Sequence, residues 1–380
     1  MQAVQTPVIP TVANWIQQHP GTISLGQGIA FYPPPPEAQE ALADFWEHPQ
    51  NHHYKGVDGI APLQEQIHLK LLQDNKIDTS YSQAVVVTPG SNMAFLNAML
   101  AVADAGDEVI LITPYYFNHE MALTLLNIRP VCVPTDDAYQ LDLDAIKKAI
   151  TPKTRAVVTV SPNNPSGAVY PKTALRAVNL LCHEHGLYHV HDEAYEYFVY
   201  EQATHFSPGS ISGSEAHTIS LFSLSKSFGF AGWRIGYMVI PSHLHAAIAK
   251  AQDTHIICPA VASQIAAVGA MKAGAAYTRQ HLASLRQTRS VVLDALKPLQ
   301  DLADIPTPMG AFYVLLRLHQ PLDPIEVVHQ LIAQHGVAVL PGTTFGLEQG
   351  CYLRVAYGAL QSDTIAEGIG RLVTGLQRIN

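Results

Sequence analysis

Short runs of β-branched and other apolar residues alternate with amphipathic stretches along the first two thirds of this chain of 380 residues. The runs are too short for typical helices and are bounded by turn-forming residues, so they favour buried strands. We predict strands at residues 85–88, 108–112, 130–133, 156–160, 187–191, 218–222 and 235–240, separated in part by helices at 118–127, 142–150 and 173–185. Strands that alternate with helices are typical of an α/β fold. We therefore expect a large domain with a mostly parallel, seven-stranded sheet between helices.

The pattern changes near residue 243. Residues 243–297 have a helical pattern, and beyond them strands at 311–318, 337–340 and 351–356 are interleaved with helices at 323–335 and 362–378. This arrangement predicts a second, smaller α/β domain, which we expect the N-terminal segment to join. The predicted division is an N-terminal arm with part of the small domain at residues 1–47, the large domain at 48–285 and the small C-terminal domain at 286–380.

Composition and charge exclude several classes of protein. Hydrophobic residues make up 48% of the chain and charged residues 14%, which indicates a folded protein and not a disordered one. The net charge of −9 argues against a general nucleic-acid binder and against a partner of anionic membranes. Residues 1–54 contain none of the basic residues that a secretory signal or transit peptide needs, so we expect a cytoplasmic protein.

Polar residues with distinctive chemistry follow several of the predicted strands. In α/β sheets, ligands bind beyond the carboxyl ends of the strands. Gly90 and Ser91 open a helix after the first strand, where a glycine turn and free helical N–H groups can bind an anion or form an ordinary turn. Asn164 follows the fourth strand in a turn made rigid by two prolines. Asp192 ends the fifth strand, either as a helix cap or with its carboxylate on the same side as Tyr195.

The segment after the sixth strand carries a lysine in unusual surroundings. Lys226 lies among small and aromatic residues, and burial disfavours the charged ammonium, so such a lysine can act as a neutral nucleophile. Arg234 adds a fork of donors suited to a phosphate or a carboxylate. An anion site, a buried lysine, a carboxylate and an arginine together suggest pyridoxal phosphate. That cofactor needs a Schiff-base lysine, a partner for its pyridine nitrogen and a phosphate site.

With these motifs the chain resembles the class I/II aminotransferases, which are fold-type-I enzymes dependent on pyridoxal 5′-phosphate. The most specific segments are Asn163-Asn-Pro-Ser-Gly167, Asp192-Glu-Ala-Tyr195 and Ser223-Leu-Ser-Lys226 with Gly232-Trp-Arg-Ile-Gly236. The resemblance extends from Leu25-Gly-Gln-Gly28 to Leu353-Arg-Val-Ala-Tyr-Gly358 and covers nearly the whole chain. It implies a transaminase that moves the amino group of an L-amino acid to a 2-oxo acid by a ping-pong Schiff-base mechanism.

The resemblance implies a role for each cofactor residue, within a large domain that binds the cofactor. Three residues would be catalytic: Lys226 as the Schiff-base lysine and proton carrier, Asp192 at the pyridine nitrogen, and Tyr195, which with Asn164 would bond the ring oxygen. Tyr116 would stack on the ring. The phosphate would be held by Ser91, Asn92, Ser223 and Arg234.

Substrate and assembly are implied in the same way. Arg354 would bind the substrate α-carboxylate, and Gly28 and Asn164 would lie beside it. Tyr54 would reach the phosphate of the neighbouring subunit, which implies a homodimer with shared active sites.

Departures from the family pattern bear on the substrate. Residues 28–33 read Gly-Ile-Ala-Phe-Tyr-Pro, which makes the substrate entrance more apolar, and Asn92 stands where many aspartate-preferring members carry a lysine. We therefore expect an apolar, sulfur-containing or aromatic donor. An aspartate- or glutamate-preferring aminotransferase, a carbon–sulfur lyase and a decarboxylase stay as alternatives. A regulator domain is disfavoured, because the first family motif begins at Leu25 and leaves no room for a preceding DNA-binding domain.

The histidines allow a smaller set of expectations. His183 and His185 lie on a predicted helix and His189 and His191 on a predicted strand, without the spacing of a ligand set, so we expect no metal site. His119 follows Tyr116 by three residues, where some family members place a histidine against the pyridine-binding carboxylate. An ordinary core or surface histidine is the alternative.

Overall fold

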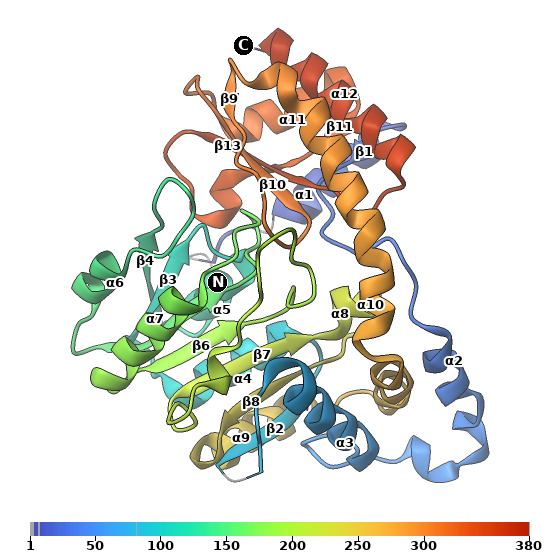
Figure 1. Ribbon diagram of the computed structural model, residues 1–380, viewed down its shortest axis with the longest axis vertical. Helices are drawn as coiled ribbons and strands as arrows, with labels where there is room; N and C mark the ends of the chain where they lie inside the picture. The colour runs from blue at the N-terminus through green and yellow to red at the C-terminus, as the bar shows by residue number, and fades with distance from the viewer. Residues whose placement is uncertain (1–3, 7, 81, 380) are drawn as a thin grey trace.

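Helices and strands alternate along the chain in a computed structural model that describes residues 4–6, 8–80 and 82–379 (Figure 1). The helices are α1 (Val8–Gln18), α2 (Pro36–Ala43), α3 (Ala61–Lys70), α4 (Ser91–Val102), α5 (Phe117–Leu125), α6 (Leu143–Ala149), α7 (Lys172–Glu184), α8 (Leu224–Ser227), α9 (His245–Ile256), α10 (Val261–Leu296), α11 (Pro324–His335) and α12 (Ser362–Ile379). The strands are β1 (Ile23–Ser24), β2 (Gln83–Thr88), β3 (Glu108–Thr113), β4 (Arg129–Pro134), β5 (Thr154–Val160), β6 (Tyr188–Asp192), β7 (Thr218–Ser223), β8 (Gly236–Pro241), β9 (Ala303–Asp304), β10 (Tyr313–Leu318), β11 (Val337–Ala338), β12 (Leu340–Pro341) and β13 (Cys351–Ala356). The predicted α/β class is confirmed.

Within the described ranges, seven strands form one sheet in the order β2-β8-β7-β6-β5-β3-β4, called the large sheet below. Its strands run parallel except for β8, which is antiparallel to both of its neighbours. Side chains on β2 alternate between two cores. Val86 packs with residues of α4 and α9 on one face, whereas Val85 and Val87 pack with α3 and α10 on the other. Burial on both faces explains why these strands have nearly continuous apolar sequences.

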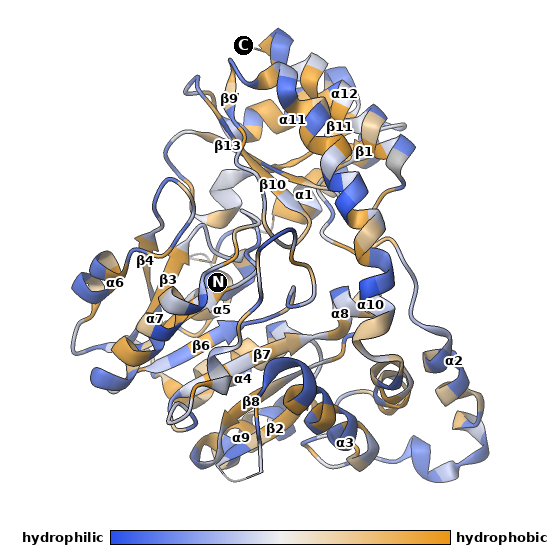
Figure 2. Ribbon diagram, viewed as in Figure 1, coloured by the Kyte–Doolittle hydropathy of each residue, from blue (hydrophilic) through white to orange (hydrophobic). Residues whose placement is uncertain are grey.

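The hydropathy of the elements follows from their positions. In Figure 2, β3, whose side chains are buried in cores on both faces of the sheet, is mostly hydrophobic, whereas α12 carries hydrophobic and polar residues along its length. Such amphipathic helices cover a core with one face and meet water with the other. Of the helices in the described part of the chain, none is long and apolar enough to cross a membrane.

A smaller sheet, in the order β12-β13-β10-β9, lies with α11 and α12 in the upper part of Figure 1. The N-terminal segment joins this unit as predicted, because β1 pairs with β11 and α1 packs near α11. The single strand predicted at residues 337–340 is wrong. β11 pairs with β1, whereas β12 pairs with β13, so the chain changes sheets at Val339.

The helical region predicted at residues 243–297 is also interrupted. It divides into α9 and α10, because Ile257 has a positive φ of 66° and Pro259 lacks the N–H that a helix needs. Within α10, Gly274 breaks the helical geometry with φ 65° and ψ −169°, a conformation that favours glycine. The long helix packs against α2 and α3 at one end and α12 at the other. The predicted boundary at residue 285 falls inside α10, and the division into domains stays a prediction.

Candidate active site

A cavity of about 440 Å³ opens at the carboxyl ends of β5, β6 and β7, where Val160, Asp192 and Ser223 lie. Its wall also contains residues of the small unit and of α1. The lining includes these predicted site residues: Gly28, Ser91, Asn92, Tyr116, Asn164, Asp192, Tyr195, Ser223, Lys226, Arg234 and Arg354. Tyr54 is outside the cavity and 79% exposed. The structure therefore gathers the motif residues into one place, while the role of each one stays a prediction.

Lys226 extends into this cavity from the short helix α8, which follows β7 directly. Ser223 caps the helix by accepting a hydrogen bond from the backbone N–H of Ser225 at 3.2 Å. The Lys226 amine donates to the carbonyl oxygen of Gly28. Burial, reinforced by the positive charges of Arg354 and Arg234, lowers the pKa of Lys226 to about 8. A sizeable share of its amine is therefore neutral near physiological pH.

The first turn of α4 has features suited to binding an anion. The first N–H groups of a helix lack partners within the helix and carry a partial positive charge. Arg234 reaches this turn, with Nη2 donating to the Pro89 carbonyl at 3.4 Å. Gly90, with a positive φ of 81°, leaves room for it, since a β-carbon there would collide with the Arg234 guanidinium. Ser91 and Ser223 add hydroxyl groups to the same wall.

Asp192 is 3% exposed at the end of β6 and is held by two contacts. Its Oδ1 accepts a hydrogen bond from the Ala194 N–H at 3.0 Å, and its Oδ2 lies 3.2 Å from Nε2 of His119. The His119 ring stacks on Phe95 with centroids 4.1 Å apart. Of the two expectations for His119, the structure supports contact with the carboxylate. A carboxylate fixed in this way can stabilise a positive charge in the cavity.

Arg354 is buried in the same cavity, on β13 of the small sheet. It donates to Oδ1 of Asn164 at 2.9 Å and to the Gly26 carbonyl at 2.6 Å. Its guanidinium lies over the rings of Tyr313 and Phe345, with its carbon 4.6 and 5.0 Å from their centroids. The Arg354 Nε has no hydrogen-bond partner within the described residues. A ligand carboxylate would satisfy this buried cation.

Several lining residues were missed by the sequence analysis, including Ile9, Phe117 and Tyr313. Ile9 comes from α1, and Tyr313 begins β10 of the small sheet. The Tyr313 hydroxyl lies 2.6 Å from that of Tyr195. Phe117 begins α5, directly after Tyr116, whereas Ile9 and Tyr313 carry no motif of their own and their positions depend on how the small unit meets the large sheet.

The four histidines considered for a metal lie apart from this cavity. His189 and His191 are buried on β6 and share the hydroxyl of Thr159, at 2.8 and 2.7 Å. Burial lowers the pKa of His189 to about 3, so this ring is neutral. His183 instead lies beside His217, with ring centroids 5.1 Å apart.

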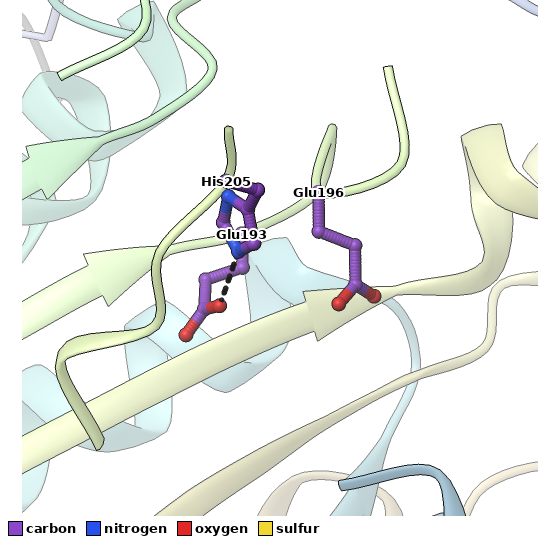
Figure 3. Close-up of side chains that lie close together, drawn as sticks. All are labelled: Glu193, Glu196 and His205. Carbon is purple, nitrogen blue, oxygen red and sulfur yellow. Dashed lines mark hydrogen bonds and ion pairs between the residues drawn. The ribbon is translucent and has the colours of Figure 1, made fainter. Parts of the chain in front are cut away.

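A different group, Glu193, Glu196 and His205, brings potential ligand atoms within 4.8 Å of one another (Figure 3). Most of these atoms already have partners, whereas Oε1 of Glu193 has none among the described residues. His205 Nε2 lies 2.8 Å from Glu193, and both oxygens of Glu196 lie 2.6 Å from Nζ of Lys70. A divalent ion at this position would face the Lys70 ammonium at close range and be repelled. We therefore interpret the group as a buried network in which Lys70 supplies the cation.

Replacing Lys70 with methionine should destabilise the protein strongly. The side chain keeps its length, but the Glu196 carboxylate is left buried without its cation beside Glu193. Breaking a buried pair in this way costs about 3–5 kcal/mol in the free energy of unfolding. Denaturant unfolding measures this loss, with Lys76→Met as the matched control, since Lys76 is exposed. A loss below ~1 kcal/mol, the size of a surface pair, would contradict the interpretation.

The comparisons with known proteins agree on one family. Residues 20–372 match the family described as aminotransferase class I and II. An aromatic aminotransferase of Arabidopsis thaliana is 31% identical, over 98% of this chain and 94% of its own length. A probable aspartate/prephenate aminotransferase of Thermus aquaticus is 34% identical, over 85% of this chain and 84% of its own. The solved structure of an aromatic aminotransferase from Pyrococcus horikoshii OT3 has a TM-score of 0.87 at 30% identity, covering 97% of this chain and 99% of its own. The chain therefore belongs to the class I and II aminotransferases and is a transaminase.

Proposed function

We propose that this transaminase uses pyridoxal 5′-phosphate to exchange an amino group between an L-amino acid and a 2-oxo acid by a ping-pong mechanism. One observation carries the proposal. A single cavity combines an amine with a lowered pKa, a buried carboxylate and a cationic anion site, at Lys226, Asp192 and Arg234. These are the three kinds of group that the cofactor requires. The names of the relatives favour transamination over the lyase and decarboxylase alternatives.

The cavity residues fit this cofactor. The first turn of α4, with Ser91, Asn92, Ser223 and Arg234, would hold the phosphate, and the missing β-carbon at Gly90 leaves the space that the Arg234 guanidinium occupies beside this turn. Asp192 would bind the protonated pyridine nitrogen, Asn164 and Tyr195 the ring oxygen, and Tyr116 one face of the ring. When bound, the cofactor supplies an electron sink for the carbanion formed at the substrate α-carbon.

The chain's own residues would bind, orient and transfer a proton. Arg354 would hold the substrate carboxylate through a bidentate pair, for which its unpartnered Nε provides a free donor. Lys226, whose amine is partly neutral, would take the proton from the substrate α-carbon and deliver it to the cofactor. The wall formed by Ile9, Ile29 and Phe117 would keep water from the reacting atoms.

The lining favours an apolar, sulfur-containing or aromatic donor. The cations that line the cavity in the described chain are Lys226, Arg234 and Arg354, and each has a function proposed above. A second carboxylate on the substrate would therefore lack a partner, which costs several kcal/mol. Asn92 is no substitute for a cation, because its amide is uncharged and offers a carboxylate only neutral N–H donors. Its Oδ1 accepts from the Tyr116 hydroxyl at 3.2 Å.

An aspartate- or glutamate-preferring enzyme is the second candidate, because some relatives are named for aspartate. It would need an arginine from a neighbouring subunit. Arg289 is not available, since it is 5% exposed and donates to Pro308 and Glu201 of its own chain at 2.8 Å. Arg279 and Arg286 line a separate cavity beside Glu196. The donor preference can therefore be tested directly.

We expect methionine, leucine and phenylalanine to be better donors than aspartate and glutamate, with kcat/KM for methionine at least tenfold higher than for aspartate. Each tenfold ratio corresponds to ~1.4 kcal/mol of transition-state stabilisation. Absorbance of the cofactor-loaded protein, mixed with a panel of L-amino acids, identifies the donors. As a control, Arg354→Lys should weaken all donors by a similar factor, since it removes the fork that reads their common carboxylate. A tenfold preference for aspartate would show that a further cation reaches the site.

We also propose a homodimer in which Tyr54 of one subunit contacts the phosphate site of the other. The support is the exposure of Tyr54, and of Trp46 nearby, at 79% and 75%, since large exposed aromatic side chains are enriched at interfaces. Sedimentation of the purified protein tests the dimer, and the cofactor dissociation constant of Tyr54→Phe tests the contact. The cytoplasmic location expected from the sequence stays a prediction.

A further inference from the structure

Tyr313 contacts three functional parts of the cavity at once. Its hydroxyl oxygen lies 2.6 Å from that of Tyr195. One face of its ring lies against the Arg354 guanidinium, whose carbon is 4.6 Å from the ring centroid. Its hydroxyl also fills the space at Gly28, where any β-carbon would overlap it, and the Gly28 carbonyl accepts from the Lys226 amine.

The position of Tyr313 is well determined by its surroundings. The residue is 1% exposed and starts β10, where it is paired with Ala356 on β13. The preceding segment is bonded to the large unit, since the Ala311 N–H donates to the Phe198 carbonyl at 2.9 Å. The hydroxyl pair therefore joins a strand of the small sheet to the loop that follows β6 of the large sheet.

The hydrogen bond between the two hydroxyls has a preferred direction once Tyr195 serves the cofactor. Each phenol carries one proton, and burial raises the pKa of both, that of Tyr313 to about 12, so both stay protonated. If Tyr195 donates its proton toward the cavity, it can only accept from Tyr313. Donation from Tyr313 polarises the Tyr195 O–H bond and makes it a stronger donor.

We propose that Tyr313 is a positioning residue that donates to Tyr195, thereby directing and strengthening the hydrogen bond from Tyr195 to the cofactor's ring oxygen. This inference rests on the function proposed above. Tyr313, which belongs to no sequence motif, would thereby control the charge on the ring oxygen of the cofactor. Through the shared contact with Arg354, the same side chain also connects cofactor binding with substrate binding.

The test compares Tyr313→Phe with Tyr195→Phe in the cofactor-loaded protein. Phenylalanine keeps the ring against Arg354 and removes the hydroxyl alone. The readout is the pH midpoint of the visible absorbance of the cofactor bound to Lys226. Loss of a donor at the ring oxygen disfavours its anion, so both midpoints should rise. We expect the Tyr313→Phe shift to be roughly 10–30% of the Tyr195→Phe shift, the strengthening that one hydrogen bond gives to the next.

The double variant and a second substitution sharpen the test. Because Tyr313 acts through Tyr195, the double variant should shift no further than Tyr195→Phe alone. Fluorotyrosine at position 313 keeps the hydroxyl and makes it a stronger acid, so the midpoint should move downward. This second variant keeps the proposal testable if Tyr313→Phe folds poorly.

Two results would overturn the inference: shifts that add in the double variant, or an unchanged midpoint in Tyr313→Phe, whether KM for amino donors is unchanged or raised. An unchanged midpoint with a raised KM would show that Tyr313 serves Arg354 alone. If the wild-type protein gave no visible band with the cofactor, the proposed function itself would fail. The two failures are therefore distinguishable.

Discussion

Replacing Lys226 with alanine should abolish turnover and leave the fold intact. Under the proposed function, the variant would lose the covalent attachment of the cofactor and the group that moves the substrate proton, and proton transfer alone contributes roughly 10²–10⁴-fold. We therefore expect kcat to fall by at least about 10⁴-fold. The fold should survive, because the Lys226 amine faces the cavity and bonds there to the Gly28 carbonyl, which water can satisfy in its place. Steady-state kinetics and thermal unfolding measure the two effects.

Two controls make the Lys226 assignment specific. Lys250→Ala removes an exposed lysine of α9 and should leave kcat unchanged. Borohydride reduction of the cofactor-loaded wild-type protein should label the peptide that contains Lys226. A label on any other peptide would show that a different lysine carries the cofactor.

Asp192→Asn should raise the activation free energy by several kcal/mol and thereby lower kcat, tenfold for each ~1.4 kcal/mol. The amide has nearly the same shape but no charge, so the pyridine nitrogen would lose its proton and the carbanion would be less delocalised. The affinity for the cofactor should fall less than kcat, because the variant leaves Arg234 and the first turn of α4 unchanged. Kinetics at saturating donor measure kcat, and visible absorbance confirms that the cofactor is bound.

The matched control is Asp304→Asn, which alters an exposed carboxylate on β9 that does not line the cavity. It should leave kcat unchanged. If Asp192→Asn kept more than about a tenth of wild-type kcat, a loss of ~1.4 kcal/mol or less, the proposed role of this carboxylate would be refuted.

The large sheet could be predicted because its information is local. Strands buried on both faces need continuous apolar runs, and residues 84–87 and 109–112 have them. The small sheet was harder, since residues 337–340 look like one strand and belong to two. What divides them is pairing with Ile23 and Arg354, which are distant in sequence. Local pattern carries no record of such partners.

The same distinction, between local sequence pattern and contacts with distant residues, explains which site residues could be predicted. Asn164, Asp192 and Lys226 each follow a strand of one sheet, so a rule about strand ends is enough to bring them together. Tyr313 and Ile9 enter the cavity from the small unit and from α1. Their positions depend on packing between the two units, which no short motif describes. The contact between His119 and Asp192 was only partly predictable. The resemblance suggested it, and the distance of 3.2 Å between Nε2 of His119 and Oδ2 of Asp192 supports it.

Because β8 runs antiparallel to β7, residues 224–235 form one loop that connects the two strands, with Ser223 paired to Gly236 where the loop begins and ends. This loop carries both Lys226 and Arg234, so a ligand held at both residues fastens the loop at two points. A ligand that binds only the ordered loop stabilises it by mass action, by about 2.7 kcal/mol at a hundredfold excess over Kd. Amide hydrogens of residues 224–235 should then exchange more slowly with cofactor present than without it. Cofactor supply in the cell would thereby govern how often this loop opens to proteases.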